Sequence, residues 1–463
     1  MKTAGIIAEY NPFHCGHRYH IEETRRQTGA DTIIAVMSPD FVQRGAPAIL
    51  DKYTRARMAL ENGADLVIEL SAVCALSSAE GFAAGSVNLL ENLGVVDAVS
   101  FGTESSPEEA PLILAAADLL RSEPAEFSAV LTGCLKDGMN YPTAQETAFA
   151  ACLRANPQNP AFAKANAETI VRLFENPNNI LALEYTKALL AAGSSMEICM
   201  IQRQGSGHND STLAGAFSCA SAIRTELLRC RSQTVGATGA ENSLQGGTFP
   251  AGTTFAAEHS AGKHYRETAA LTDSLCAGNL PASVLTAIEQ AGPCALLRED
   301  DFSDLLFFSI EEKQTSLQQY GTANADLAAR CGRLLEQFEN WSQFAALLKT
   351  KNQTYSAISR YLAHLLLGIT AKDRETAAAF GFAPYARVLG FRTGATPLIK
   401  QMKERSRVPL LLRPARDMQL LSEEQKHLFG LDLHAAAVYS RILYTRTGKL
   451  RLHELRQPLI ILP

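Results

Sequence analysis

The chain has 463 residues, of which 46% are hydrophobic and 20% charged, and its formal net charge is −5. This length exceeds what one ordinary hydrophobic core organises, so two or three domains are expected. No apolar run reaches the roughly 18 residues of a membrane span, and Glu9 interrupts the apolar start where a signal peptide would continue, so a cytoplasmic protein is expected. The ten cysteines contain no CxxC pair and no cluster with histidine, which predicts reduced thiols and no protein-bound metal.

Strands and helices alternate regularly over the first hundred residues. Short apolar runs predict strands at 3–10, 31–38, 64–70 and 95–104, and amphipathic stretches predict helices at 17–29, 50–63 and 78–94. This alternation is typical of an α/β fold with a Rossmann-like parallel sheet wound by right-handed crossovers.

The pattern changes after Glu104. Ser106, Pro107 and Glu109 form a helix-start signature, and helical periodicity continues to about residue 174, which predicts a helical insertion over 105–174. The sheet is expected to resume near 194–203, so that 1–230 forms one α/β domain. Residues 231–262, rich in Gly, Thr, Ala and Ser, predict a flexible junction or insertion, and 263–463 predicts a mainly α-helical domain.

Positive charge is concentrated at the C-terminal end. From Tyr385 onward there are fourteen Lys and Arg residues against six Asp and Glu residues, a net charge of +8, while the remainder carries −13. Such a distribution suits a polyanion-binding face, although a solvated helix surface would have the same composition.

The stretch "NPFHCGH", residues 11–17, carries the clearest chemistry. It lies between the first predicted strand and the first helix, where backbone N–H groups and the helix dipole favour an anion. His14 and His17 can each donate a ring N–H to phosphate oxygens, and Gly16 lets the backbone approach a phosphate. Two histidines close together by chance, or a zinc site lacking a third ligand, are the weaker interpretations, and His20 is expected to be a packing residue.

Several further blocks, taken in order along the chain, resemble those of the tRNA(Met) cytidine acetate ligases, within the HxGH nucleotidyltransferase superfamily. The blocks are "EYNPFHCGHRYH", "AVMSPDFVQRGAPAI", "RMALENGADLVIEL", "FGTE", "NPNNILALEYTKAL", "IQRQGSGHND" and "CASAIR". The resemblance is strong over residues 4–230 and looser beyond. Cys15, Ala46, Ala182, Cys219 and Ala222 depart from the family's usual residues, but none of them is assigned to phosphate chemistry.

The resemblance implies a reaction in which ATP activates acetate as acetyl-adenylate. The acetyl group then passes to the exocyclic amine of the wobble cytidine of elongator tRNA(Met). It implies ATP as a substrate, and Mg²⁺ is expected because phosphate charge must be offset during transfer. It leaves the acetate-binding residues and the oligomeric state open.

The resemblance also assigns roles to residues of this chain. His14 and His17 are expected to be catalytic, holding the ATP phosphates and stabilising the transition state. The expected ATP-binding residues are Ile7, Ala8, Glu9, Tyr10, Asn11, Pro12, Phe13, His14, Cys15, Gly16, His17, Gly102, Asn179, Arg203, Ser221 and Arg224. Within the basic C-terminal region, the expected tRNA-binding residues are Lys400, Lys403, Arg405 and Arg407.

Two other functions are compatible with the HxGH motif alone. A small-molecule adenylyltransferase of cofactor synthesis would share the motif but has no need of a basic C-terminal domain. A non-catalytic RNA-binding protein on a nucleotidyltransferase fold would not need to keep His14, Gly16, His17, Ser221 and Arg224 together.

Overall fold

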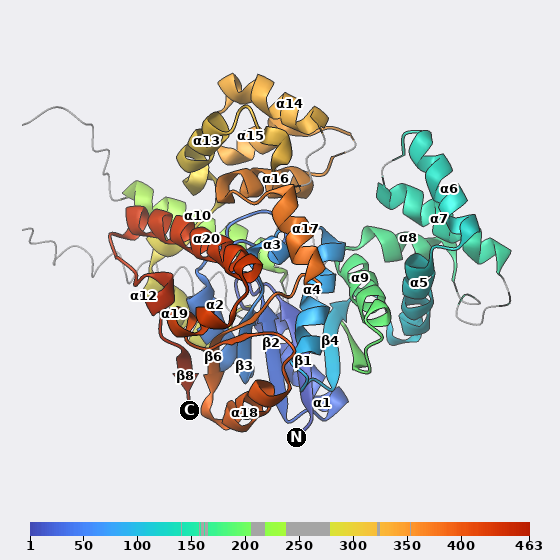
Figure 1. The fold of residues 1–463 in the computed structure, drawn as a ribbon, viewed down its shortest axis with the longest axis horizontal. Helices are drawn as coiled ribbons and strands as arrows, with labels where there is room; N and C mark the ends of the chain where they lie inside the picture. The colour runs from blue at the N-terminus through green and yellow to red at the C-terminus, as the bar shows by residue number, and fades with distance from the viewer. Residues whose placement is uncertain are drawn as a thin grey trace, which may run out of the picture.

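A mixed sheet of eight strands forms the centre of this computed structural model (Figure 1). The strand order is β5-β4-β1-β2-β3-β6-β7, and β8 also pairs with β6. The strands are β1 (Thr3–Ala8), β2 (Thr32–Met37), β3 (Leu66–Glu69), β4 (Ala98–Thr103), β5 (Glu197–Gln202), β6 (Ala386–Arg392), β7 (Leu410–Leu411) and β8 (Ile460–Leu462). The structure describes residues 1–139, 141–156, 158, 162, 165–204, 218–237, 278–321, 325–351 and 353–463.

The first five strands are mutually parallel, which confirms the α/β fold class predicted from the sequence. From β1 the chain winds through β2 and β3 on one side and later through β4 and β5 on the other. The connections that leave the carboxyl ends of β1 and β4 therefore run in opposite directions. The place between these two strand ends is a topological switch point, where α/β sheets bind their ligands.

The C-terminal region is mainly helical, as the sequence predicts, and it also contributes the strands β6, β7 and β8 to the sheet. Its strand β6 pairs antiparallel with β3, with Leu66 opposite Phe391, and β7 and β8 extend the sheet from β6. The buried residues of "ARVLGFR" give this strand an apolar character that suits the middle of a sheet. The basic region therefore folds back onto the N-terminal sheet.

Helices cover both faces of the sheet. Those that pack on the sheet are α1 (Cys15–Thr28), α2 (Lys52–Glu61), α4 (Ala79–Asn92), α9 (Pro177–Ala191), α10 (Ala220–Ala237), α12 (Ala282–Ala291) and α18 (Thr396–Arg405). Alternate residues of β1 face opposite cores: Ile7 joins the face covered by α4 and α9, and Ile6 joins the face covered by α1, α2 and α10. Since α10 continues to Ala237, the junction expected from residue 231 is helical at its start; from 238 to 262 it lies outside the described residues.

The helical insertion expected over 105–174 is present. After η1 (Pro107–Glu109) it consists of α5 (Ala110–Ser122), α6 (Ala125–Lys136), α7 (Tyr141–Ala155) and α8 (Ala167–Glu175). Ser106 and Glu109 form the capping box that the sequence predicts. The insertion projects from the side of the sheet next to α9 (Figure 1).

A second helical unit lies beyond the carboxyl edge of the parallel strands (Figure 1). It contains α13 (Ser303–Glu312), α14 (Ala325–Leu334), α15 (Trp341–Leu348), α16 (Tyr355–Leu367) and α17 (Ala371–Ala379), and it packs on α3 (Ala72–Ala75) and α20 (Glu423–Thr447). Short pieces complete the described chain: η3 (Pro293–Ala295), η4 (Glu299–Phe302), η5 (Leu317–Gln319), η6 (Leu335–Gln337), η7 (Thr393–Ala395), α19 (Pro414–Asp417), η8 (Met418–Leu420) and η9 (Glu454–Arg456). Trp341, the only tryptophan, is fully buried in the core of this unit.

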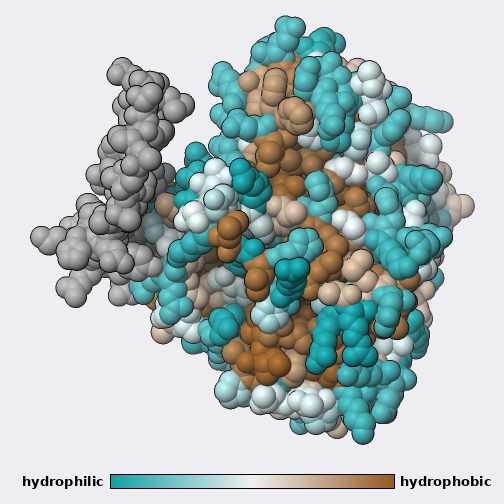
Figure 2. Space-filling model, turned by 60° about the vertical axis from the view of Figure 1, so that its left-hand side comes forward, coloured by the Kyte–Doolittle hydropathy of each residue, from teal (hydrophilic) through white to brown (hydrophobic). Residues whose placement is uncertain are grey.

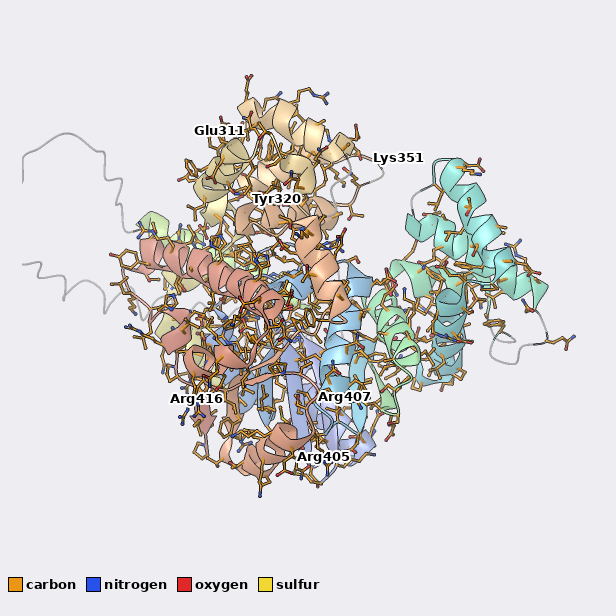
Figure 3. All side chains as sticks on the ribbon, viewed as in Figure 1. Glu311, Tyr320, Lys351, Arg405, Arg407 and Arg416 are labelled. Carbon is orange, nitrogen blue, oxygen red and sulfur yellow. The ribbon has the colours of Figure 1, made fainter. Side chains whose placement is uncertain are left out.

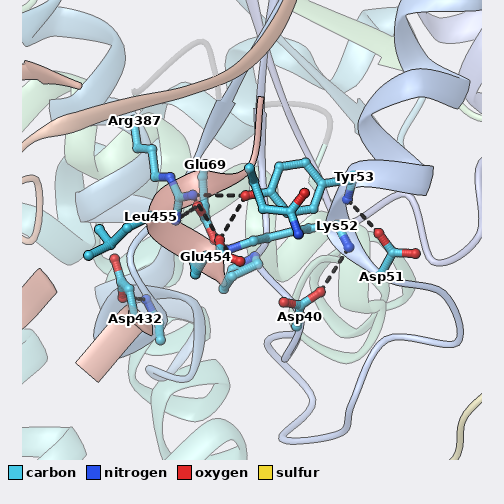
Figure 4. A network of polar contacts seen from close by, with 12 residues as sticks. Asp40, Asp51, Lys52, Tyr53, Glu69, Arg387, Asp432, Glu454 and Leu455 are labelled. Carbon is cyan, nitrogen blue, oxygen red and sulfur yellow. Dashed lines mark hydrogen bonds and ion pairs between the residues drawn. The ribbon is translucent and has the colours of Figure 1, made fainter. Parts of the chain in front are cut away.

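A buried ion-pair network joins the C-terminal segment to the sheet (Figure 4). Lys52 Nζ lies 2.6 Å from Glu69 Oε1 and 2.5 Å from Glu454 Oε1. Arg387 Nη1 lies 3.0 Å from Glu69 Oε2, and Arg387 Nη2 lies 2.8 Å from Glu454 Oε1. Two cations and two carboxylates thus form ion pairs across α2, β3, β6 and η9.

On the face shown in Figure 2, hydrophobic side chains are visible along the middle and polar ones around the edge. Exposed large hydrophobic residues include Phe308 on α13, Leu420 on η8, Leu450 after α20 and Ile461 on β8. Within the described residues, no helix is both long and apolar enough to cross a bilayer.

Candidate active site

A cavity of about 450 Å³ opens at the switch point between β1 and β4. Its lining includes Ile7 and Glu9 at the end of β1, Gly102 in β4, and Arg203 directly after β5. The cavity therefore spans the carboxyl ends of the parallel strands, as the fold class predicts for a ligand site.

His14 and His17 are fixed by the first turn of α1. His14 is the N-cap residue, and its Nδ1 accepts a hydrogen bond from the Gly16 N–H at 3.0 Å. His17 Nδ1 accepts in turn from the His14 N–H at 3.2 Å, so the two imidazoles form a reciprocal capping box. Because both Nδ1 atoms accept, the ring proton of each neutral histidine is on Nε2. Each ring thus keeps one N–H donor for a ligand.

Burial and nearby cations keep the histidines neutral. Burial, reinforced by Arg203 and Arg224, lowers the pKa of His14 to about 3. Burial followed by His14, Arg203 and His20 holds the pKa of His17 well below its usual value, and burial with Arg203 lowers that of His20 to about 4. At neutral pH these side chains are hydrogen-bond donors without charge.

Two helix N-termini meet at the cavity. α1 begins at Cys15, and α10 begins at Ala220 with Ser218, Cys219 and Ser221 lining the same space. Asn279 joins them: its backbone carbonyl accepts from the Cys15 N–H and its Oδ1 from the Ser218 N–H, both at 2.8 Å. Arg224 Nη1 also donates to the Asn11 carbonyl at 2.8 Å. The positive ends of two helix dipoles are therefore directed at one anion-binding space.

Most of the expected ATP-binding residues line the cavity. They are Ile7, Ala8, Glu9, Tyr10, Asn11, His14, Gly16, His17, Gly102, Arg203, Ser221 and Arg224. His20, expected to be a packing residue, also lines it and hydrogen-bonds to Ser100 Oγ at 2.9 Å. Pro12, Phe13 and Cys15 belong to the same loop but are not part of the lining.

The side chain of Asn179 contacts the loop after β4, next to the cavity. Its side chain is fully buried and does not line the cavity. Asn179 Oδ1 accepts from Thr103 Oγ1 at 2.6 Å and from the Glu104 N–H at 2.9 Å, while its Nδ2 donates to the Arg172 carbonyl. We therefore assign Asn179 to holding the loop after β4, next to Asn178, which does line the cavity.

Gly16 and Gly102 differ in how much space their surroundings leave for a side chain. A Cβ on Gly16 would lie 2.8 Å from Cε1 of His14, so Gly16 makes room for the histidine ring, a reason that differs from the phosphate approach expected from the sequence. A Cβ on Gly102 would lie 3.4 Å from Cγ of Arg203, which is an ordinary contact. A side chain is therefore tolerated less well at position 16 than at position 102.

The sequence analysis missed the wall of the cavity that the second helical unit supplies. Thr354, Ser356 and Arg360, at and within the start of α16, line the cavity opposite the sheet. Arg360 Nη1 donates to the Gln43 carbonyl at 3.3 Å, and Gln43 and Arg44 line the same end. No local pattern signals this wall, because α16 is more than 300 residues away from the loop that it contacts.

A further part of the lining is apolar and aromatic. Phe82 of α4, Phe101 of β4 and Tyr185 of α9 contribute to it, and the Phe101 and Tyr185 rings lie 5.2 Å apart. These residues belong to the core on the α4 and α9 face of the sheet. The cavity thus combines a cationic, donor-rich side with an aromatic side, as a nucleotide requires.

The four residues expected to bind tRNA lie away from this cavity. Lys400, Lys403 and Arg405 are exposed on α18, and Arg407 follows it with its backbone N–H bonded to the Asn92 carbonyl. Because β6 runs antiparallel to β3, α18 lies at the amino edge of the parallel strands, as the labels of Arg405 and Arg407 show (Figure 3). The structure groups these residues together but does not bring them to the cavity.

The chain matches the family model described as HIGH Nucleotidyl Transferase over residues 1–453. A protein of Clostridium kluyveri named tRNA(Met) cytidine acetate ligase is 35% identical over 444 residues, covering 95% of each chain. A protein of the same name from Acetivibrio thermocellus is 30% identical over 442 residues, covering 95% of this chain and 94% of its own. Crystal structures of Thermotoga maritima TmcAL superpose over all of both chains at 26% identity. The TM-score is 0.82 for an apo form and 0.81 for a form bound with alpha-thio ATP.

Proposed function

The chain belongs to the tRNA(Met) cytidine acetate ligase family of HIGH nucleotidyl transferases, and we propose that it catalyses the reaction in that name. It uses ATP to activate acetate as acetyl-adenylate and transfers the acetyl group to the exocyclic amine of the wobble cytidine of elongator tRNA(Met). The observation that carries the proposal is the anion-binding space formed by His14, His17 and the N-termini of α1 and α10.

The first step joins two anions and therefore needs positive surroundings. An acetate oxygen attacks the α-phosphorus of ATP, and pyrophosphate leaves with the electrons of the broken P–O bond. The Nε2–H groups of His14 and His17 donate to the phosphate oxygens, where negative charge builds up in the transition state. Arg203 and Arg224 line the same space and offset the charge of the phosphates.

Adenylation prepares the second step. The carbonyl carbon of acetate accepts an amine only when one of its oxygens is part of a good leaving group, and the adenylate supplies that group. When the cytidine amine attacks, AMP departs. Its phosphate remains in the space that already binds phosphates, so the same donors serve both steps.

Magnesium enters this proposal as a companion of ATP. Among the described residues there is no group of three His, Cys, Asp or Glu side chains that could hold a metal ion. We therefore propose that Mg²⁺ arrives bound to the ATP phosphates, where it offsets their charge, and we assign no protein ligand to it.

The tRNA contact of Lys400, Lys403, Arg405 and Arg407 stays a prediction that rests on charge. These side chains are exposed at the amino edge of the parallel strands, so a tRNA that also reaches the cavity would extend along the side of the molecule. A substrate tRNA is consistent with a cytoplasmic protein.

The test is to incubate the protein with ATP, labelled acetate and bulk tRNA, and then to digest the tRNA to nucleosides. The expected product is labelled acetylcytidine, together with one AMP per acetyl group. Label in a small molecule alone would support a cofactor adenylyltransferase instead. Binding of tRNA without any AMP release would support a non-catalytic RNA-binding protein.

A further inference from the structure

Glu9 stands out because it is the sole carboxylate among the described residues that line the cavity. The other ionisable groups of that lining include four arginines, at positions 44, 203, 224 and 360, and three histidines, at 14, 17 and 20. A site built only to bind two anions would have no use for a negative side chain. We therefore expect the Glu9 carboxylate to bind a group that donates hydrogen bonds.

The position of Glu9 is fixed from both sides. Its Oε1 accepts a hydrogen bond from the Gln43 backbone N–H at 3.0 Å. Its backbone carbonyl accepts from Nη1 of Arg55 at 2.6 Å, and Arg55 is itself fully buried. Because Gln43 N–H occupies Oε1, the second carboxylate oxygen is the one available to a ligand.

Glu9 lines the same cavity as Tyr185 of the aromatic wall and Arg224 of the phosphate-binding space. Burial, then the negative charge of Glu9, raises the pKa of Tyr185, which belongs to the aromatic wall. Burial and the positive charge of Arg44 lower the pKa of Arg224, while Glu9 acts on it in the opposite sense. The carboxylate is thus close to a surface suited to a flat base and to the side chains that face the phosphates.

The loop that holds Glu9 is in turn held by α16. Gln43 accepts from Arg360, and Ser359 Oγ donates to the Gly45 carbonyl at 3.0 Å. This end of the cavity is therefore built jointly by β1, the loop after β2 and the second helical unit. The phosphate-binding end, by contrast, is built by α1 and α10.

The chemistry of the reactants selects the partner of Glu9. The phosphates of ATP, acetate and pyrophosphate are anionic, so a carboxylate repels them. The ribose hydroxyls and the 6-amino group of ATP can donate to a carboxylate, but they lose no proton in the reaction. The attacking nucleophile is an amine whose N–H groups are donors, and it must lose a proton as it becomes an amide. A fixed carboxylate that lines the same cavity suits both needs.

We propose that Glu9 accepts a hydrogen bond from the exocyclic amine of the substrate cytidine and takes its proton during acetyl transfer. The inference rests on the proposed function and adds a catalytic residue to its second step. The amine nitrogen forms a bond to the acetyl carbon, and the bond from that carbon to the phosphate oxygen breaks. The oxygen leaves with the electron pair as AMP, and the amine proton moves to the Glu9 carboxylate, which later releases it to water.

The test separates the two half-reactions in the full-length Glu9→Gln variant. Glutamine keeps an acceptor oxygen for the Gln43 N–H but cannot take a proton. Acetate-dependent exchange of pyrophosphate into ATP is expected to fall much less than acetyl transfer does. Acetyl transfer to tRNA is expected to fall by about 100-fold, the size typical of general base catalysis.

A trapping assay and two further variants make the outcome interpretable. Hydroxylamine, a stronger nucleophile, is expected to trap acetyl-adenylate as acetohydroxamate equally well in wild type and Glu9→Gln. Glu9→Asp, which keeps a carboxylate but is one methylene shorter, is expected to recover part of the transfer rate. Glu61→Gln, on the outer side of α2, serves as the charge-matched control and is expected to match wild type in all assays.

Three results would overturn the assignment. Transfer at the wild-type rate in Glu9→Gln would show that the carboxylate is not needed. A raised KM for ATP in the exchange assay would place Glu9 at the adenosine or ribose. Equal loss of exchange and transfer in both Glu9 variants would make it a structural residue. Absence of acetate-dependent exchange in the wild-type protein would instead refute the proposed function itself.

Discussion

At the scale of single residues, the most informative feature is the pair of histidines that cap one helix. Because Nδ1 of each ring accepts a backbone N–H, the tautomer is set by the fold before any ligand binds. Such preorganised donors need no rearrangement when charge develops on a phosphate. The HxGH spacing thus encodes both the turn and the orientation of the donors.

This arrangement makes a prediction for NMR of ring-labelled histidine. The ring nitrogens of His14 and His17 should have the chemical shifts of the neutral Nε2–H tautomer at pH 7. Because the pKa of His14 is about 3 and that of His17 is well below normal, these shifts should stay constant down to pH 5. Assignment uses the His14→Gln and His17→Gln variants, and a titration midpoint near 6.5 would contradict the structure.

Asn179 leads to a prediction about stability and not about ligand contact. Asn179→Leu removes the acceptor of the Glu104 N–H and leaves buried donors unsatisfied, so the free energy of unfolding should fall by about 2 kcal/mol. The temperature of unfolding should drop, while the Kd for ATP, measured by calorimetry on the folded protein below that temperature, should change less than threefold. A large loss of ATP affinity at unchanged stability would restore the direct contact expected from the sequence.

At this scale, prediction is easiest where the residues are close in sequence. His14, Gly16 and His17 lie within four residues of one another, and all three line one cavity. The burial of Asn179 could not be predicted, because the donors to its side-chain oxygen come from a loop about 75 residues earlier. Arg360 was missed for the same reason, since its contact with Gln43 spans 317 residues.

At the scale of elements, the contact between α16 and the loop after β2 closes the cavity. Gly45 has φ +81°, and a Cβ there would lie 2.2 Å from the backbone nitrogen of Arg360. Ser359 Oγ connects this glycine to the core, because it accepts from Nε1 of Trp341 at 3.3 Å. The helix and the loop therefore meet backbone to backbone.

The Gly45→Ala substitution should therefore separate the loop after β2 from α16. The clash and the left-handed conformation together are expected to lower the free energy of unfolding by about 3 kcal/mol. The fluorescence of Trp341 reports the change directly in denaturant titrations. Gly193→Ala is the matched control: its φ is +58° but no atom lies within 4 Å of the added Cβ, so about 1 kcal/mol is expected. Equal effects in both variants would show that the close contact is unimportant.

The helix α18 allows the expected tRNA contact to be tested apart from catalysis. Replacing Lys400 and Lys403 by alanine should weaken tRNA binding and reduce the dependence of log K on log salt by about 0.7 to 0.9 per lost phosphate contact. Acetate-dependent exchange should not change, because α18 lies at the other edge of the sheet. An unchanged salt dependence would remove these residues from the tRNA-binding surface.

The parallel strands and their helices could be predicted because each element carries its own signal. The predicted strands at 3–10 and 31–38 each contain a run of five apolar residues, and the helix after residue 50 has Asp51 as its N-cap, as observed. By contrast, β6 lies in a basic, helix-rich region, and its pairing with β3 depends on residues more than 300 positions away. A seven-residue strand without a neighbouring hairpin partner offers no local evidence of where it pairs.

At the scale of the whole molecule, the network of Lys52, Glu69, Arg387 and Glu454 joins the two ends of the chain. Burial opposes the charge of Glu454, but Lys52 and Arg387 outweigh burial and lower its pKa to about 2. Removing one member of such a network leaves a buried charge uncompensated. The return of the C-terminal segment to the sheet therefore depends on all four side chains.

Glu454→Gln is expected to lower the free energy of unfolding at pH 7 by about 3 kcal/mol, as measured by denaturant titration. Since the folded pKa lies below the value of about 4.3 in an unfolded chain, this stabilisation is complete above that pH and is lost as pH falls toward 2. The difference between wild type and variant should shrink over that window. Glu423→Gln, which removes an exposed ion pair with Lys426, should cost less than about 1 kcal/mol. A difference that is independent of pH would contradict the role of the network.

The central claim is that one cavity adenylates acetate before tRNA is engaged. The most direct measurement is the exchange of labelled pyrophosphate into ATP by the purified protein, with and without acetate and without any tRNA. Exchange is expected to require acetate and to proceed in the absence of tRNA. It should be abolished in His17→Ala while tRNA binding persists. Exchange that occurs without acetate, or only when tRNA is present, would contradict the central claim.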